Sequence, residues 1–156
     1  MRAVAAAVAC ALLVLGATLG PPPSHAQRDA GLAVVAHPSC GVTELSGAEL
    51  EAIFTSSMRR WPNGRTIVPF NYPPDHVLRR SFDRQVLRLT PSGVSRFWIN
   101  QRIRGGARPP RQVSDVRLMT RVLPRLAGSV GYVPGSSIPP GTRVVCRVQS
   151  GRVLAP

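Results

Sequence analysis

The sequence has 156 residues, 44% of them hydrophobic, which is enough for one domain with one modest core and too few for several. Its 20 basic residues, all arginine, stand against 7 acidic ones and give a formal net charge of +13. Such a surface attracts small anions, acidic polymers and anionic membranes. Nucleic-acid binding is not expected, because aromatic side chains are not interleaved with the arginines.

The N-terminal segment, residues 1–26, is typical of a secretory signal peptide. Arg2 supplies the positive start, an uncharged apolar core of 17 residues follows, and Ser24-His25-Ala26 matches a small-x-small cleavage site. A membrane anchor is the rival interpretation, because this core approaches spanning length. The prolines at 21–23 favour cleavage after Ala26. We therefore expect a periplasmic or secreted mature chain of residues 27–156, with no stable membrane span.

The first elements of the mature chain carry clear local signals. Leu32–Ala36 is a continuous apolar run, the pattern of a strand that is covered on both faces. The stretch Leu45–Gly64 contains a helix whose first turn has a capping box, with Ser46 as N-cap and Glu49 three residues later. The apolar stripe of this helix consists of Leu50, Ile53, Phe54 and Met58.

The next segment predicts a strand, a loop and a second helix. Thr66–Phe70 is the strand, and Pro69 indicates that it is an edge strand or ends there. Asp75 closes the loop as a candidate N-cap. The helix spans His76–Arg88, and its buried stripe consists of Leu78, Phe82, Val86 and Leu89.

Two more helices and two more strands are expected. Thr90 as N-cap and Pro91 at the first helical position open a third helix, and Ser114 caps a fourth. The third helix presents Val94, Phe97 and Trp98 to the core, and residues 107–113 are a connector. The two expected strands are Val130–Val133 and Thr142–Val148. Residues 149–156 are expected to be a frayed tail. The order of elements predicts an α/β fold in one domain, residues 27–148.

The residues also resemble a known family. Ile53-Phe54, then Trp61 and Gly64, and later Val130–Val133 occur in the order seen in the phosphate-binding, periplasmic solute-binding proteins of ABC transporters. The resemblance runs from about Val34 to Val133. It implies a single periplasmic-binding-protein-like lobe of type 2, with a small mixed sheet flanked by about four helices. It also implies a small anion such as phosphate as ligand and an ABC transporter as partner.

The sequence departs from that family in two ways. Full-length members have two lobes, whereas this chain has room for about one. After the second strand, family members have an arginine and then Ser-Gly-Thr at a helix start, where backbone N–H groups hold the oxyanion. Here the matching stretch is 71–78, Asn-Tyr-Pro-Pro-Asp-His-Val-Leu. Its two prolines lack N–H groups, and Asp75 places a negative charge near the expected anion.

The remaining candidates for ligand binding are Asn71, Tyr72, Arg79 and Arg80, with His76 between them. They follow the end of a strand, where open α/β sheets bind ligands, and paired arginines can hold a carboxylate or phosphate. The alternative is a loop with local hydrogen bonds whose arginines pair with Asp83. A second basic cluster consists of Arg102, Arg104, Arg108 and Arg111, and it is either an anion site or a solvated surface.

Two cysteines remain after signal cleavage, Cys40 and Cys146, and in an oxidising compartment they predict one disulfide. Two separate buried thiols are the alternative. Neither metal ligands nor a cofactor motif occur at a recognised spacing, and His37 and His76 have no triad partner. We therefore expect a non-catalytic solute-binding-like module, or alternatively a cell-envelope protein that binds acidic polymers, anionic lipid or a partner protein.

Overall fold

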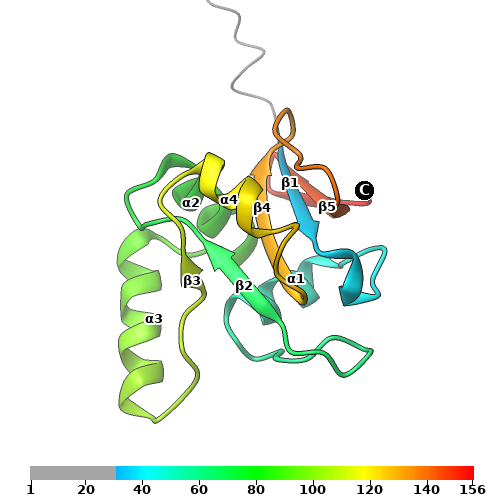
Figure 1. Cartoon of the computed structure of the whole chain (residues 1–156). Helices are drawn as coiled ribbons and strands as arrows, with labels where there is room; N and C mark the ends of the chain where they lie inside the picture. The colour runs from blue at the N-terminus through cyan, green and yellow to red at the C-terminus, as the bar shows by residue number, and fades with distance from the viewer. Residues whose placement is uncertain (1–30) are drawn as a thin grey trace, which may run out of the picture.

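The structure, a computed structural model, describes residues 31–156; the expected signal peptide and its cleavage site lie outside the described residues. A six-stranded mixed sheet in the order β3-β2-β4-β1-β5-β6 organises the domain (Figure 1). The strands are β1 Leu32–Ala36, β2 Val68–Asn71, β3 Arg111–Gln112, β4 Ser129–Pro134, β5 Arg143–Gln149 and β6 Arg152–Leu154. The sheet and its helices confirm the predicted α/β class.

The apolar run at the start of the mature chain forms the central strand. Every residue of β1 is buried, as expected for a strand that is covered on both faces. β1 pairs antiparallel with β4 and with β5, and Val34 lies opposite Tyr132 on one side and Cys146 on the other. The first and last thirds of the domain are therefore joined through this strand.

β2 carries the residues of the candidate site at its C-terminal end. It runs parallel to both neighbours, pairing with β4 at Val68 and Pro69 and with β3 at Phe70 and Asn71. Pro69 was expected to mark an edge or a strand end. It lies inside β2, before the residues that pair with β3. The N–H of the preceding Val68 points toward the β4 side and donates to the Gly128 carbonyl, just before β4, at 3.0 Å. The missing N–H of Pro69 therefore faces a position without a strand partner.

Within residues 31–156, four α-helices flank the sheet. They are α1 Gly47–Phe54, α2 Val77–Phe82, α3 Pro91–Ile103 and α4 Val116–Val122, with a short 3₁₀ turn, η2, at Pro38–Cys40 and a π-helical turn, η3, at Asp83–Leu87. The capping box of α1 is present, with Ser46 and Glu49 bonded reciprocally. Thr90 caps α3 and Pro91 occupies its first turn. The local signals at these two helix starts are confirmed.

Two other helix starts differ from the expectation by one residue. His76, not Asp75, caps α2, because its Nδ1 accepts the Leu78 N–H at 3.2 Å. Asp115, not Ser114, caps α4 and accepts the Leu118 N–H at 2.8 Å. The second expected helix is also divided, because α2 continues as η3 before Arg88 adopts a left-handed conformation with φ 55°.

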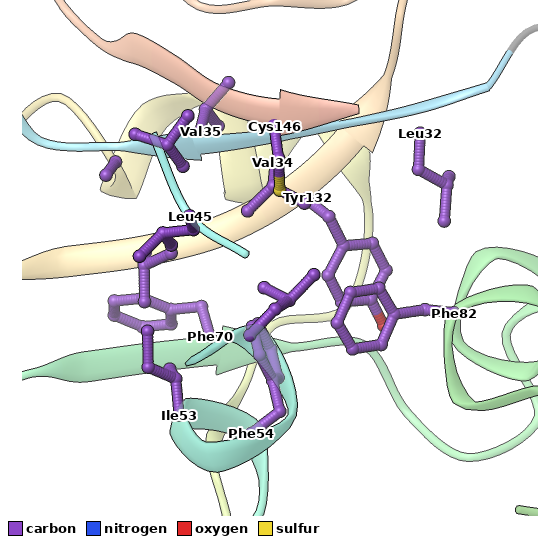
Figure 2. Close-up of a cluster of buried hydrophobic side chains, with 14 of the residues drawn as sticks. Leu32, Val34, Val35, Leu45, Ile53, Phe54, Phe70, Phe82, Tyr132 and Cys146 are labelled. Carbon is purple, nitrogen blue, oxygen red and sulfur yellow. The ribbon is translucent and has the colours of Figure 1, made fainter. Parts of the chain in front are cut away.

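The core lies between β1, β4 and β5 on one side and α1 with η3 on the other. Figure 2 shows Phe54, Phe82 and Tyr132 meeting beneath Val34 and Cys146. Phe82 stacks on Tyr132 with ring centroids 4.1 Å apart and 3° between the planes. α4 packs closely against β4 at Gly131, where a Cβ would lie 2.8 Å from the Met119 sulfur. These contacts fix β4, and with it the position of Tyr132.

The predicted disulfide does not form, and both cysteines are buried free thiols. Cys40 lies past the end of β1, where its Sγ donates to the Ser129 carbonyl 3.5 Å away, and the same carbonyl accepts the His37 N–H. Cys146 lies opposite Val34. Along β1, the level of His37 and the level of Val34 are three strand residues apart, or about 10 Å. A disulfide tolerates a Cα separation of only about 7 Å.

Three further segments differ from the expectation. The connector contains the short strand β3, and the tail expected to be frayed contains β6, which forms a hairpin with β5. Phe97 and Trp98 are only half-buried, so Val94 is the one fully buried residue of α3. Within residues 31–156, no helix has the length and apolarity to cross a membrane.

Candidate functional site

A buried polar cluster lies at the C-terminal end of β2. The side-chain oxygen of Asn71 accepts hydrogen bonds from the Tyr132 hydroxyl and from the Tyr72 N–H, the latter at 2.9 Å. The Tyr72 hydroxyl donates to the Tyr132 carbonyl at 3.0 Å. β2 and β4 are therefore tied together at this end by side chains as well as by backbone pairing. Asn71 and Tyr72, two of the predicted site residues, are central to this link.

The two tyrosine hydroxyls stay neutral. Burial raises the pKa of Tyr72, and the charge of Asp115 adds to the effect. Burial also raises the pKa of Tyr132 well above its usual value. A neutral hydroxyl can act as donor and as acceptor of a hydrogen bond. Here each hydroxyl donates its hydrogen bond to another group of the protein. Their role is to position β2 and β4, and they have no free proton to give to a ligand.

Arg79 is the next predicted site residue, and it is buried with an exposed fraction of 5%. Its Nε donates to Asp83 Oδ2 at 2.6 Å, and its Nη1 donates to the Tyr72 carbonyl at 3.1 Å. The pair Arg79–Asp83 is the one ion pair in residues 31–156. The pairing with Asp83, which the sequence left open as an alternative, is therefore present at Arg79. The second guanidinium nitrogen, Nη2, takes part in neither bond.

Asp83 is the least satisfied polar group of the cluster. Its exposed fraction is 5%, and its Oδ1 is buried without a hydrogen-bond partner. Burial raises the pKa of Asp83, while the charge of Arg79 and the hydrogen bond to it act in the opposite direction. A buried carboxylate oxygen without a partner costs free energy, on the order of 1–3 kcal/mol or more. Such an atom marks a place where a ligand with a donor group would lower the free energy.

A cleft of about 210 Å³ lies over this pair. α2 and η3 contribute its charged residues, α3 contributes Trp98, and the segment leading into β3 contributes the opposite wall. The full lining is Pro74, Arg79, Asp83, Pro91, Val94, Ser95, Trp98, Pro109, Pro110 and Gln112. The cleft lies next to the C-terminal ends of β2 and β3, which is where open α/β sheets hold ligands.

His76 and Arg80 lie beside the cluster and do not enter it. The His76 ring stacks on the Tyr72 ring, with centroids 4.3 Å apart and 12° between the planes, and its Nδ1 caps α2. Arg80 is exposed and donates to the Asp75 carbonyl. The structure thus brings Asn71, Tyr72 and Arg79 together and leaves Arg80 outside.

Arg80 instead lines a second, shallower cleft. Arg80, Arg84 and Arg88 follow each other at intervals of four residues and line a cleft of about 430 Å³ with Leu89, Thr90 and Pro91. None of these arginines has an acidic partner within the described part of the chain. Their combined positive field extends toward solvent, so it raises the local concentration of anions without fixing one in place.

Sequence reasoning missed two residues of the site, Asp83 as part of the cleft lining and Tyr132 as a residue that positions β2. Asp83 was considered only as a partner for the arginines, and its spacing of four residues from Arg79 was the available signal. Tyr132 gave no signal, because the residue it bonds lies 61 positions away. In residues 31–156, no group of three or more His, Cys, Asp or Glu side chains has the arrangement of a metal site.

The arrangement defines one α/β lobe with a polar cleft at the ends of its parallel strands, and solved structures share this fold. An ABC-type phosphate transport receptor from Vibrio cholerae matches 74% of this chain with a TM-score of 0.59 and 17% identity. A putative phosphate ABC transporter substrate-binding protein with bound phosphate from Clostridium perfringens matches 74% with a TM-score of 0.60 and 14% identity. PstS from Borrelia burgdorferi matches 74% with a TM-score of 0.58 and 15% identity.

The matched part covers 45%, 44% and 46% of these three proteins, so the chain spans a little under half of their length. The structural likeness confirms the expected fold, a periplasmic-binding-protein-like lobe. No protein-family model matches the sequence. No curated protein matches it either.

Proposed function

We propose that this chain is an exported, non-catalytic module that binds a small oxyanion such as phosphate, as an accessory of an ABC transporter. The ligand occupies the cleft between η3 and α3. Arg79 supplies the positive charge, Asp83 accepts a hydrogen bond from the ligand, and Asn71 and Tyr72 hold β2 and the Arg79 guanidinium in place. Arg80, outside the cleft, adds to the attractive field.

One observation carries the proposal. Arg79 and Asp83 both line the cleft, Arg79 has an N–H edge that neither Asp83 nor Tyr72 uses, and Asp83 Oδ1 is buried without a partner. A ligand that fits both must present an acceptor and a donor. A protonated oxyanion does so, because its charged oxygens face the guanidinium and its O–H faces the carboxylate. The phosphate bound in the similar protein from Clostridium perfringens is an anion of this class.

Thermal unfolding tests the proposal with phosphate and sulfate as probes. Phosphate keeps at least one O–H at neutral pH, whereas sulfate has none and would repel Oδ1. At a hundred times its dissociation constant, phosphate should stabilise residues 27–156 by ~2.7 kcal/mol. That corresponds to a shift of about 5 °C or more in the melting temperature, and sulfate should give a much smaller shift. Equal shifts with both anions would contradict the proposed role of Asp83.

Asp83→Asn sharpens the test, because it keeps an oxygen for Arg79 Nε and replaces the free oxygen by an N–H₂ donor. We expect this variant to prefer sulfate to phosphate, reversing the order seen for the unchanged protein. Asp75→Asn is the matched control, since Asp75 is exposed and outside the cleft lining but undergoes the same chemical change. It should leave the phosphate shift unchanged. If both variants lose it alike, the effect is not specific to Asp83, and the proposed role of Asp83 is wrong.

The basic surface favours a second candidate, a cell-envelope protein that binds an acidic polymer, anionic lipid or an acidic partner. Twenty arginines against seven acidic residues, with one ion pair in the described part of the chain, leave most of the positive charge free for such a partner. Salt separates the candidates. Binding through exposed arginines should weaken steeply between about 0.05 and 0.15 M salt, whereas binding at the buried Arg79 should weaken less.

A further inference from the structure

The outer face of α3 exposes two isoleucines one helical turn apart. Ile99 has an exposed fraction of 56% and Ile103 one of 77%, whereas only Val94 of this helix is fully buried. Counting about 100° per residue, Arg96 lies on one side of the two isoleucines and Arg102 on the other. The remaining large hydrophobic residues with high exposure occur singly on other segments: Val77, Leu118, Ile138 and Leu154. Single exposed hydrophobic residues are normal, but an aligned pair between arginines is not explained by packing.

The segment around α3 is uniformly positive. Residues 84–114 contain seven arginines and no acidic residue. All seven are exposed, and none forms an ion pair with any residue in 31–156: Arg84, Arg88, Arg96, Arg102, Arg104, Arg108 and Arg111. The six acidic residues within 31–156 all lie outside this segment. The charge is therefore concentrated on one part of the molecule and is not spread evenly.

α3 also lies at the margin of the domain. Figure 1 shows it along the left side of the domain, with β3 and then β2 of the sheet drawn to its right. Its aromatic residues Phe97 and Trp98 pack edge to face with each other, 5.0 Å apart, and are half-buried. The outward face therefore carries isoleucine and arginine and none of the large aromatic side chains that dominate protein–protein hot spots.

We propose that the outer face of α3 binds the surface of a bilayer that contains anionic lipid. Ile99 and Ile103 insert among the acyl chains nearest the headgroups, while Arg96 and Arg102 extend along them and bond the lipid phosphates. A soluble acidic polymer would contact the arginines and gain nothing from the isoleucines. An acidic protein would favour an aromatic anchor in place of short aliphatic chains. The inference deepens the second candidate function, and it does not depend on the cleft at Asp83.

Vesicle co-sedimentation of residues 27–156, which contain every described strand and helix, tests this surface. One vesicle preparation contains equal parts of phosphatidylglycerol and phosphatidylcholine, and the other contains phosphatidylcholine alone. We expect binding to the first at ~0.15 M salt, and binding to the second to be at least about tenfold weaker, since each arginine near an anionic surface contributes roughly fivefold. Equal binding to both would overturn the proposal.

Paired variants locate the surface. Arg96→Gln with Arg102→Gln should weaken binding to the anionic vesicles about 20-fold or more. Arg121→Gln with Arg125→Gln removes the same charge from exposed positions in and after α4 and should weaken it less than about threefold. Ile99→Ser with Ile103→Ser should also weaken binding, with an unchanged melting temperature because both side chains are exposed. Equal losses in the two arginine variants would show a general charge effect and refute the assignment.

Two soluble probes separate this surface from the other possibilities. Heparin should displace the unchanged protein from anionic vesicles, and the isoleucine variant should bind heparin as well as the unchanged protein does. If the isoleucine variant still bound vesicles fully, the ligand would be an acidic polymer and the bilayer proposal would be wrong. Inorganic phosphate at concentrations that stabilise the cleft should not displace the vesicles. If phosphate did not shift the melting temperature but the protein still bound anionic vesicles, the proposed function of the cleft alone would be wrong.

Discussion

At the scale of single residues, Tyr132 has the largest number of roles in the site. Its ring stacks on Phe82, its hydroxyl donates to Asn71, and its carbonyl accepts from Tyr72. Removing the hydroxyl leaves the ring contacts unchanged but deprives the buried oxygen of Asn71 of one of its two donors. A buried acceptor that loses a partner costs about 1–3 kcal/mol. The hydroxyl of Tyr132 therefore stabilises the end of β2 that carries the cleft.

Tyr132→Phe should lower the free energy of unfolding by about 1–2 kcal/mol, measured in urea with an unchanged dependence on denaturant concentration. It should also weaken the phosphate shift, because Tyr72 and the Arg79 it holds would lose their fixed position. Ser81→Ala is the control, since this half-buried residue on α2 lies outside the cleft lining. A variant as stable as the unchanged protein would show that the Asn71 contact contributes nothing.

At the scale of elements, the parts of the fold with local signals were predictable from the sequence. The capping box at Ser46 and the apolar run of β1 depend on residues within one turn or one strand of each other, so their spacing identifies them. β3 and β6 have two and three residues, too few for a pattern of alternating burial. They are strands because β2 and β5 offer unpaired backbone beside them. No property of their own residues predicts that.

The same distinction applies to the candidate site. The pairing of Arg79 with Asp83 follows from a spacing of four residues on a helix and was anticipated as an alternative. The bond between Tyr132 and Asn71 depends on the register of β2 against β4, which the sequence does not encode locally. The free oxygen of Asp83 is likewise a consequence of tertiary packing. The charge of the site was predictable, and its geometry was not.

The hairpin of β5 and β6 leads to a prediction that would not hold for a frayed tail. Val153 packs against α1 beside Gly47, and the Gly151 N–H donates to the Gln85 side chain at 2.9 Å. Deleting residues 150–156 should lower the free energy of unfolding by about 1–3 kcal/mol, through lost burial of one valine and lost hydrogen bonds. It should also expose β5 as an open edge and promote association. Urea unfolding and size-exclusion chromatography measure the two effects, and deleting 155–156 alone should cause neither.

At the scale of the whole molecule, the domain holds together by burial of its core without a covalent link. Val34, Phe54, Phe82 and Tyr132 join β1, β4, α1 and α2 in one cluster. The two thiols belong to that cluster as small apolar groups. Burial raises the pKa of Cys40 to about 11 and that of Cys146 to about 12, so both are protonated at neutral pH and unreactive. Their separation along the sheet is what keeps them independent.

This separation predicts that stability is independent of the redox state of the buffer. A disulfide between Cys40 and Cys146 would close a loop of about a hundred residues and contribute up to ~4.7 kcal/mol, so reduction would lower the melting temperature by ten degrees or more. With two free thiols, dithiothreitol should change the melting temperature by less than about one degree. Both thiols should resist a thiol reagent in the folded protein and react after unfolding in urea. A melting temperature that falls on reduction would show that the strands rearrange to join the two cysteines, because the register of β1 with β5 forbids the bond as the sheet stands.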